Sequence, residues 1–269
     1  MKTMKRLFRN VRWLLRAMLL LCCVTFVMAC SDDNDKHSKP IPLYSYNQLY
    51  YEETNTTSTE NGLTITRDEA GRVVGIESFM PGDDFVEKLM SAPTSFDEIK
   101  YLFPLSEGNE IRLIGSGKNP PIGENSDYRD LAHYEQSYEN YNQYYKNVPV
   151  SSWFRINYFI TPEGKRLSYA MGSPFIDVKN LDPKPSITEQ QARQVLADYL
   201  DIDSDDSWTC SLLIREYVTK KDGKIQRDIR LIYRIRGPYA PMDDNVYYIT
   251  APQYHAEVDA HTGQLLIFD

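Results

Sequence analysis

Paired stretches of alternating apolar and polar residues, joined by short turns, constrain the fold of this 269-residue chain more than any other feature. Alternation with a period of two predicts a strand that buries one face, and a turn between two such strands predicts a hairpin. The clearest pair turns at Pro162-Glu163-Gly164, and its apolar positions are Phe154, Ile156, Tyr158 and Ile160, then Leu167, Tyr169 and Met171. We therefore expect long antiparallel strands here.

Further hairpins are predicted on both sides of this pair. Residues 63–65 and 74–76 alternate around a turn at 68–71, after a Thr/Asn/Ser stretch that is typical of a loop. Later strands are expected at 212–218, 229–235 and 247–249, followed by a closing hairpin that pairs 254–258 with 265–267. In that hairpin we expect Asp259 to accept hydrogen bonds from backbone N–H groups and Gly263 to adopt a positive φ.

Helices are predicted before two of these groups of strands. Asp83 or Asp84 can cap a first helix that ends near Pro93. The sequence Ser186-Ile187-Thr188-Glu189 matches a capping box, and the apolar stripe that follows has helical spacing. A helix followed by antiparallel strands therefore occurs twice. We predict an α+β fold of two consecutive units, each an antiparallel sheet packed on a helix, preceded by an N-terminal hairpin.

The first thirty residues carry a targeting signal. Six basic residues precede an apolar run from Ala17 to Ala29, which is the pattern of a secretory signal peptide and is too short to span a bilayer. The cleavage region Val27-Met28-Ala29-Cys30 resembles the bacterial lipobox, which implies that Cys30 is lipidated, with palmitate among its acyl chains. The acidic stretch 31–35 resembles the signal that sends some Bacteroidetes lipoproteins to the cell surface. We expect a lipoprotein anchored in the outer membrane through lipid on Cys30 and exposed at the surface of the cell envelope.

Four segments follow from these patterns. They are a signal peptide at 1–29, an acidic tether at 30–42, a hairpin plus a first α+β unit at 43–180, and a second α+β unit at 181–269. Residues 1–29 hold six of the 30 basic residues and none of the 38 acidic ones, so residues 30–269 carry a net charge of −14. A surface of this charge repels nucleic acid, and we expect no nucleic-acid partner.

The chemistry-bearing residues form no recognised catalytic pattern. No H-E-x-x-H, G-x-S-x-G, phosphate-binding or dinucleotide-binding motif occurs, so we expect no enzyme activity, no metal site and no cofactor. His255 and Glu257 share a strand face, where a surface pair is favoured over a metal site. Cys210 is expected to be a buried small side chain rather than a nucleophile.

Two clusters are candidates for binding a partner. Tyrosines are dense between 134 and 158, and the candidate partner-binding residues are Tyr138, Tyr141, Tyr144, Tyr145 and Tyr158. Tyrosine is enriched at interfaces, but it also packs across strands, and the sequence leaves both roles open. Arg230, Arg234 and Arg236 lie on one strand face, where a solvated face that blocks aggregation is favoured over a ligand site.

A family resemblance joins these pieces. Tyr141–Val150 (YNQYYKNVPV) resembles the F-Q-Q-T-Y-K-G-I-P-V segment of thermolysin/fungalysin-type propeptides, and the elements that follow it have the same order through Gly172 and the helix headed by Pro185. Val258–Leu266 (VDAHTGQLL) is similar to the V-D-A-x-T-G-x-V-L ending of PepSY domains. Asn147 stands where the family has Gly, and Asn tolerates the left-handed conformation that the turn needs.

The resemblance implies a cystatin-like or PepSY-like module without a peptidase domain, because none follows Asp269. Propeptides of this type cover the cleft of a peptidase and assist its folding. We therefore expect a non-catalytic surface lipoprotein that binds, and inhibits or chaperones, a secreted peptidase in trans. The alternative is a surface lipoprotein that captures a glycan or a peptide with exposed tyrosines.

Overall fold

The computed structural model describes residues 39–50, 54–78, 85–120, 134–237 and 255–269. All of its helices and strands lie in one compact unit, Pro40–Asp269. In chain order they are η1 (Tyr46–Gln48), β1 (Thr56–Glu60), β2 (Leu63–Arg67), β3 (Val73–Glu77), α2 (Phe85–Ser91), α3 (Phe96–Ile99), η2 (Lys100–Leu102), β4 (Asn109–Lys118), β5 (Glu135–Tyr145), β6 (Val148–Thr161), β7 (Gly164–Ser173), α4 (Glu189–Leu200), β8 (Thr209–Lys221), β9 (Lys224–Arg236), β10 (His255–Asp259) and β11 (Leu265–Phe268). The predicted strand at 247–249 and the caps Asp83 and Asp84 lie outside the described residues.

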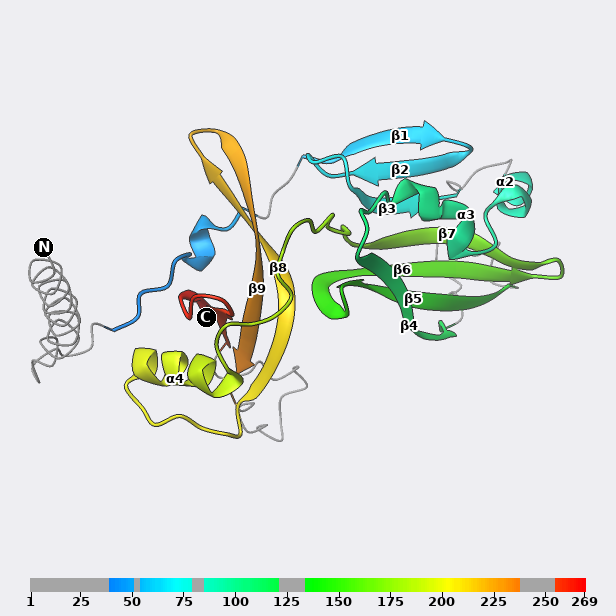
Figure 1. Ribbon diagram of the computed structural model, residues 1–269. Helices are drawn as coiled ribbons and strands as arrows, with labels where there is room; N and C mark the ends of the chain where they lie inside the picture. Colours follow the sequence, from blue (N-terminus) through cyan, green and yellow to red (C-terminus); the bar gives the residue numbers. More distant parts are fainter. Residues whose placement is uncertain (1–38, 51–53, 79–84, 121–133, 238–254) are drawn as a thin grey trace, which may run out of the picture. The chain divides into compact units, whose positions relative to one another are not determined.

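The strands form one mixed sheet of 11 strands, with only a few short helices beside it (Figure 1). Their order is β1-β2-β3-β7-β6-β8-β9-β10-β11, with β4 and β5 attached through β6. In the described part of the chain 51% of the structure is strand and 14% is helix. The predicted α+β fold of two consecutive units, each an antiparallel sheet packed on a helix, is therefore wrong.

The physical reason for this correction is β6. It runs for 14 residues and pairs with β5, β7 and β8, so one hydrogen-bonded ladder joins segments that the sequence pattern treats as separate. The pairing with β8 is parallel and connects Val150 to Ile214. Alternation predicts where a strand lies but not its partner, because pairing depends on residues far apart in the chain.

The strands β1–β7 share a core on one face. The short helices α2 and α3 lie beside β3 and β7 (Figure 1), and the ring of Phe96 stacks on Tyr141 with centroids 4.4 Å apart. Strand β1 was predicted as a loop, because Thr56–Glu60 has no apolar alternation; its threonines still favour extended backbone, and it forms an exposed edge strand. The largest fully buried side chains of this core are Tyr158, Phe154, Ile65, Ile76, Ile99, Ile156 and Leu167.

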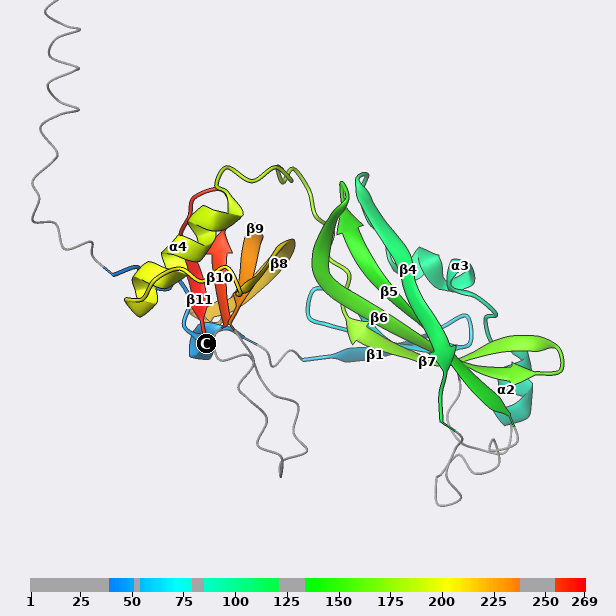
Figure 2. The same ribbon diagram turned by 90° about the horizontal axis from the view of Figure 1, so that it is seen from below.

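The strands β8–β11 bury both of their faces. Helix α4 lies on one face of these strands (Figure 2) and contacts β9 and β10, and its Leu196 is fully buried. The segment Leu43–Tyr50, which the sequence assigns to the N-terminal hairpin region, covers the other face: Leu43 N–H donates to Leu265 O and Tyr50 N–H to Val218 O. Folding thus brings the start of this unit onto its last strands.

Local turns and caps match the predicted chemistry, with one shift. The capping box of α4 uses Thr188 and Gln191, two residues beyond the predicted Ser186 and Glu189. Ser186 is held outside the helix because its N–H donates to Ala260 O. In the closing hairpin, Asp259 accepts from the N–H groups of His261 and Thr262, and Gly263 has φ +74°, as predicted. Asn147 has φ +70°, which confirms the predicted turn.

Candidate functional site

The face of the β5–β6–β7 strands that points away from α2 and α3 carries unusually large exposed side chains. Trp153 is 48% exposed, Tyr169 43% and Met171 54%. They share this face because Trp153 pairs with Ser173, Arg155 with Met171 and Asn157 with Tyr169, and directly paired residues in an antiparallel sheet point to the same side. We call this surface the outer face, and its residues are Tyr138, Asn140, Asn142, Trp153, Arg155, Tyr169, Met171 and Ser173.

The candidate tyrosines divide between the two sides of the sheet. Tyr141, Tyr145 and Tyr158 are 8%, 3% and 0% exposed, so their rings belong to the core and are not available to a partner. Tyr138 and Tyr144 are half-buried on the other side. Alternation separates them, because neighbouring residues of a strand point to opposite faces: on β5 Tyr141 and Tyr145 lie in the buried phase, and Tyr138 and Tyr144 lie in the other phase.

The inward tyrosines are fixed by a carboxylate. Tyr141 and Tyr158 each donate a hydrogen bond of 2.9 Å to Glu139 Oε2. Burial, followed by the hydrogen bond to Glu139 and then the Glu139 charge, raises the pKa of both hydroxyls. Lys165 pairs with Glu139 at 2.7 Å, and together these hydrogen bonds outweigh the burial of Glu139 and lower its pKa. The hydrogen bonds and the ion pair of Glu139 therefore hold the two buried tyrosines in place within the core.

The outer face itself is held rigidly on its β4 side. The Arg155 guanidinium lies 3.8 Å from the centroid of the Tyr138 ring and donates to Asn119 Oδ1 at 2.6 Å. A Cβ on Gly117 would lie 2.7 Å from the Tyr138 hydroxyl, so only glycine lets this ring lie close to β4. Cation–π stacking and close packing thus fix Tyr138 and Arg155 in place.

Two amides border Trp153 without partners of their own. Asn142 pairs directly with Trp153 across the strands, and Asn140 pairs with Arg155. Within the part of the chain that the structure describes, neither amide side chain makes a hydrogen bond to protein. Each amide offers both donors and an acceptor, so this border of the outer face can bind hydroxyl groups of a ligand.

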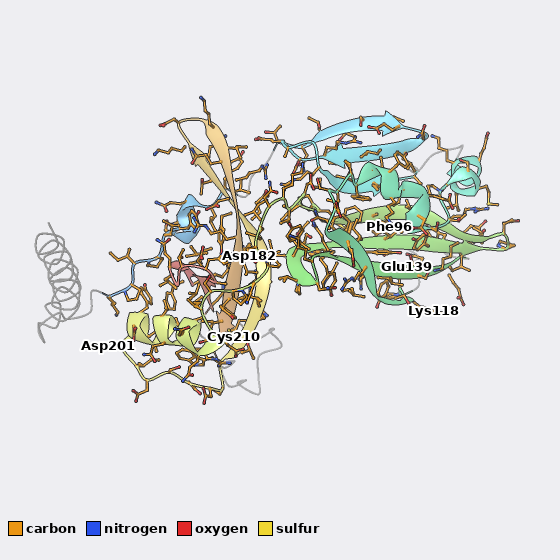
Figure 3. All side chains as sticks on the ribbon, viewed as in Figure 1. Phe96, Lys118, Glu139, Asp182, Asp201 and Cys210 are labelled. Atoms are coloured by element: carbon orange, nitrogen blue, oxygen red, sulfur yellow. The ribbon has the colours of Figure 1, made fainter. Side chains whose placement is uncertain are left out.

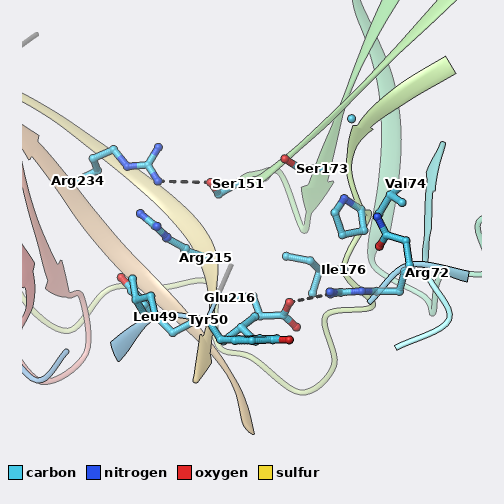
Figure 4. Close-up of a pocket in the computed structure, with 15 residues that line it drawn as sticks. Leu49, Tyr50, Arg72, Val74, Ser151, Ser173, Ile176, Arg215, Glu216 and Arg234 are labelled. Atoms are coloured by element: carbon cyan, nitrogen blue, oxygen red, sulfur yellow. Dashed lines mark hydrogen bonds and ion pairs between the residues drawn. The ribbon is translucent and has the colours of Figure 1, made fainter. Parts of the chain in front are cut away.

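A cavity of about 520 Å³ opens next to the outer face (Figure 4). Its charged lining consists of Arg72, Arg215 and Arg234 with one acid, Glu216. Arg72 pairs with Glu216 at 2.7 Å, and Arg234 Nη2 donates to Ser151 Oγ at 3.3 Å. Arg72 also pairs with Asp68 at 2.7 Å, and Glu257 pairs with both Arg215 and Arg234, so each arginine of the lining has a carboxylate partner.

A buried carboxylate positions two of these arginines. Glu257 is fully buried; its carboxylate pairs with Arg215 and with Arg234 Nε at 2.9 Å, and it accepts from the Tyr217 hydroxyl at 2.6 Å. Burial alone would raise the pKa of Glu257, but hydrogen bonding to His255 and the two arginine charges lower it to about 2. His255 Nε2 lies 3.5 Å from Glu257 Oε1, so the expected pair forms, but Glu257 is fully buried and the expected position of the pair at the surface is wrong.

The expected solvated arginine stripe is also wrong for two of its three members. Arg234 binds Glu257, and Arg230 pairs with Asp228 at 2.7 Å and with Asp259 at 2.8 Å. Arg236 remains exposed. The acids that hold Arg230 and Arg234 come in part from β10, a partner that the strand's own sequence cannot reveal.

The remaining candidate residues of the described ranges form neither a reactive thiol nor a metal site. Cys210 packs half-buried where β8 passes α4 (Figure 3), and burial, followed by the Glu189 charge, raises the pKa of its thiol to about 12. No group of three or more His, Cys, Asp or Glu residues in the described ranges could hold a metal ion. No helix among the described residues is long and apolar enough to cross a membrane, and Cys30 lies outside these residues.

Sequence reasoning missed the three most exposed residues of the outer face. Trp153 directly precedes the buried Phe154, so it lies in the opposite phase of β6, which faces away from the core. A large apolar residue in this otherwise polar phase was a signal that the sequence contained. Tyr169 and Met171 were assigned to the buried phase with Leu167. A register shift between Asn157 and Tyr158 overturns that assignment, because it turns Leu167 and Ala170 inward.

Comparison with known proteins found no match to this chain. No protein-family model matches the chain, and no curated protein and no solved structure shows significant similarity to it. The propeptide-like and PepSY-like resemblance therefore stays a prediction, and the function has to be argued from the site itself.

Proposed function

We propose that this chain is a non-catalytic binding protein, held at the cell envelope by lipid on Cys30, that captures a glycan on its outer face. One observation carries the proposal. Trp153, Tyr169 and Met171 are all more than two-fifths exposed on two neighbouring strands of one sheet face. A single exposed apolar residue needs no explanation, but a contiguous group of large ones marks a binding surface.

The residues around this group favour a glycan. The C–H face of a sugar ring packs on an aromatic ring, while its hydroxyl groups need donors and acceptors at the rim of the contact. The unpartnered amides of Asn140 and Asn142 stand directly beside Trp153 and Arg155 and supply both. The fixed stack of Arg155 on Tyr138 means that little side-chain freedom is lost when a ligand binds.

A glycan array tests this proposal with a chain produced from residue 31 onward. Wild-type protein should bind a defined group of glycans, and Trp153→Ala should weaken that binding at least tenfold, about 1.4 kcal/mol. Tyr101→Ala is the control, because Tyr101 is also an aromatic side chain, 54% exposed, but lies on η2 rather than on the outer face. An empty array, or equal losses for the two variants, would reject the proposal.

A secreted peptidase bound in trans is the second candidate. It rests on the propeptide-like resemblance and on the composition of the outer face, since Trp, Tyr, Met and Arg are enriched at protein interfaces. This candidate predicts that wild-type protein slows substrate cleavage by peptidases secreted from the same cell. It also predicts that Trp153→Ala relieves the inhibition while Tyr101→Ala does not; unchanged cleavage rates across metallo- and cysteine peptidases would exclude it.

A further inference from the structure

Strand β4 is an open edge of the sheet. It runs for ten residues, Asn109–Lys118, and pairs only with β5, so its other side has no strand partner in the described part of the chain (Figures 1 and 2). Two neighbouring aliphatic side chains near its centre, Leu113 and Ile114, are 54% and 52% exposed. An edge that offers both free backbone groups and apolar side chains is a template for pairing with another strand.

The hydrogen bonds at both ends of β4 show which of its residues face outward. Lys146 N–H donates to Gly108 O, and Asn119 N–H donates to Gln136 O, so the residues just before and just after β4 both bond toward β5. In an antiparallel pair the bonding residues alternate along a strand, and the bulge in the middle of β4 shifts this alternation by one residue. The residues whose backbone groups point away from β5 are therefore Ile111, Leu113, Ser116 and Lys118.

The bulge decides which strand fits this edge. Leu113 and Ser116 are three residues apart, whereas the outward residues of a regular strand are two apart. A regular strand therefore loses its register at the bulge, and only a strand with a bulge at the same place can bond along the whole edge. A second copy of β4 that runs antiparallel meets this condition, because the two bulges then lie opposite each other.

The side chains suit the same register. Its pairs, each between one copy and the other, are Leu113 with Ser116, Ile114 with Gly115, Arg112 with Gly117, Ile111 with Lys118, and Glu110 with Asn119. Three large side chains near the centre thus lie opposite a serine or a glycine. Like charges directly opposite each other would weaken such a pair, and this register contains none.

We propose that two copies of this chain associate through β4, antiparallel and about a two-fold axis, with Leu113 of each copy opposite Ser116 of the other. The contact involves one strand from each copy, so the dimer is weak and reversible. Directly opposite residues point to the same side of a sheet, so the two outer faces lie on one side of the dimer. This arrangement permits bivalent binding of whatever ligand the outer face takes.

Sedimentation equilibrium of the chain produced from residue 31 onward, from micromolar to millimolar concentration, tests the association. The average mass should rise from one chain toward two. Ile114→Lys places a charge on the edge and should weaken the dimer at least about tenfold. Ile202→Lys is the matched control, because Ile202 is 48% exposed and lies just beyond α4, and it should associate as wild type does. Both variants should melt at the wild-type temperature, because both side chains are exposed.

A mass of one chain at every concentration overturns the inference and leaves the edge to a strand of another protein. A dimer that Ile114→Lys does not weaken overturns it as well, because the contact then lies elsewhere.

Disulfide cross-linking tests the register, in a Cys210→Ala background that leaves only the introduced thiols. Leu113→Cys combined with Ser116→Cys should join two copies on mild oxidation, because paired residues place their Cα atoms about 5.5 Å apart, within disulfide range. Leu113→Cys alone should cross-link much less, because the two copies of residue 113 lie about 10 Å apart along the strands. Equal yields of covalent dimer from the single and double variants overturn the proposed pairing.

Discussion

Replacing Glu257 with glutamine removes the charge that Arg215 of β8 and Arg234 of β9 share. Glu257 is fully buried, and its pKa is lowered from 4.5 to about 2, because the hydrogen bond from His255 and the two arginine charges outweigh the cost of burial. A group whose pKa is lower in the folded state stabilises the fold above its unfolded pKa and loses that contribution as the pH falls. The lowering corresponds to about 3 kcal/mol at neutral pH.

The pH range of the effect follows from the same two values. The contribution of Glu257 is complete above about pH 5, falls to about 1 kcal/mol near pH 3, and is nearly absent at pH 2. Glu257→Gln should therefore be much less stable than wild type at pH 7, and the difference between the two should shrink by about 3 kcal/mol between pH 7 and pH 2.

Urea unfolding followed by circular dichroism measures this difference at each pH. Glu135→Gln is the control, because Glu135 is exposed and its ion pair with Lys118 lies at the surface, where such pairs contribute little. Its difference from wild type should stay within about 0.5 kcal/mol throughout. If Glu257→Gln differs from wild type by a constant amount between pH 7 and pH 2, the charged carboxylate of Glu257 does not stabilise the fold through the two arginines.

Three further predictions test the fold. Gly172→Ala should lower the unfolding free energy by about 1–3 kcal/mol or more, because its Cβ would lie 2.1 Å from the Trp153 carbonyl oxygen, whereas Gly115→Ala, with open space around it, should leave the melting temperature nearly unchanged. Thr188→Ala should cost about 1 kcal/mol in urea unfolding because Thr188 caps α4, and Ser186→Ala should cost less than half of that if the cap lies where the structure places it. Cys210 should react with iodoacetamide at pH 8 at least about 100-fold more slowly than free cysteine, because its thiol has a pKa of about 12; a comparable rate, followed by mass spectrometry, would refute this.

Local features of this chain follow well from its sequence. Alternation and turn residues predict the hairpins β2–β3, β6–β7 and β10–β11, and the chemistry of Asp259, Gly263 and Asn147 predicts the turns. These features depend on residues within a few positions of each other. The helix α4 is also predicted, with its start displaced by two residues because Ser186 bonds to Ala260.

Long-range features could not be read in the same way. The parallel pairing of β6 with β8 at Val150 and Ile214 joins the two expected sheets into one. The residues around these two positions do not indicate this pairing. A shift of one residue in register moves side chains to the other face of a strand. For this reason Tyr169 and Met171, which were predicted in the core, lie on the outer face. The arginine cavity likewise depends on Glu257 of β10 meeting arginines of β8 and β9.

Quenching of tryptophan fluorescence tests the role of the outer face most directly. In a chain produced from residue 31 onward the tryptophans are Trp153, 48% exposed, and Trp208, 2% exposed, so the emission that acrylamide quenches comes from Trp153. Saturation with a glycan selected on the array should shield Trp153 and cut the quenchable fraction by more than half. A quenchable fraction that stays the same while the glycan is bound would show that the ligand lies elsewhere.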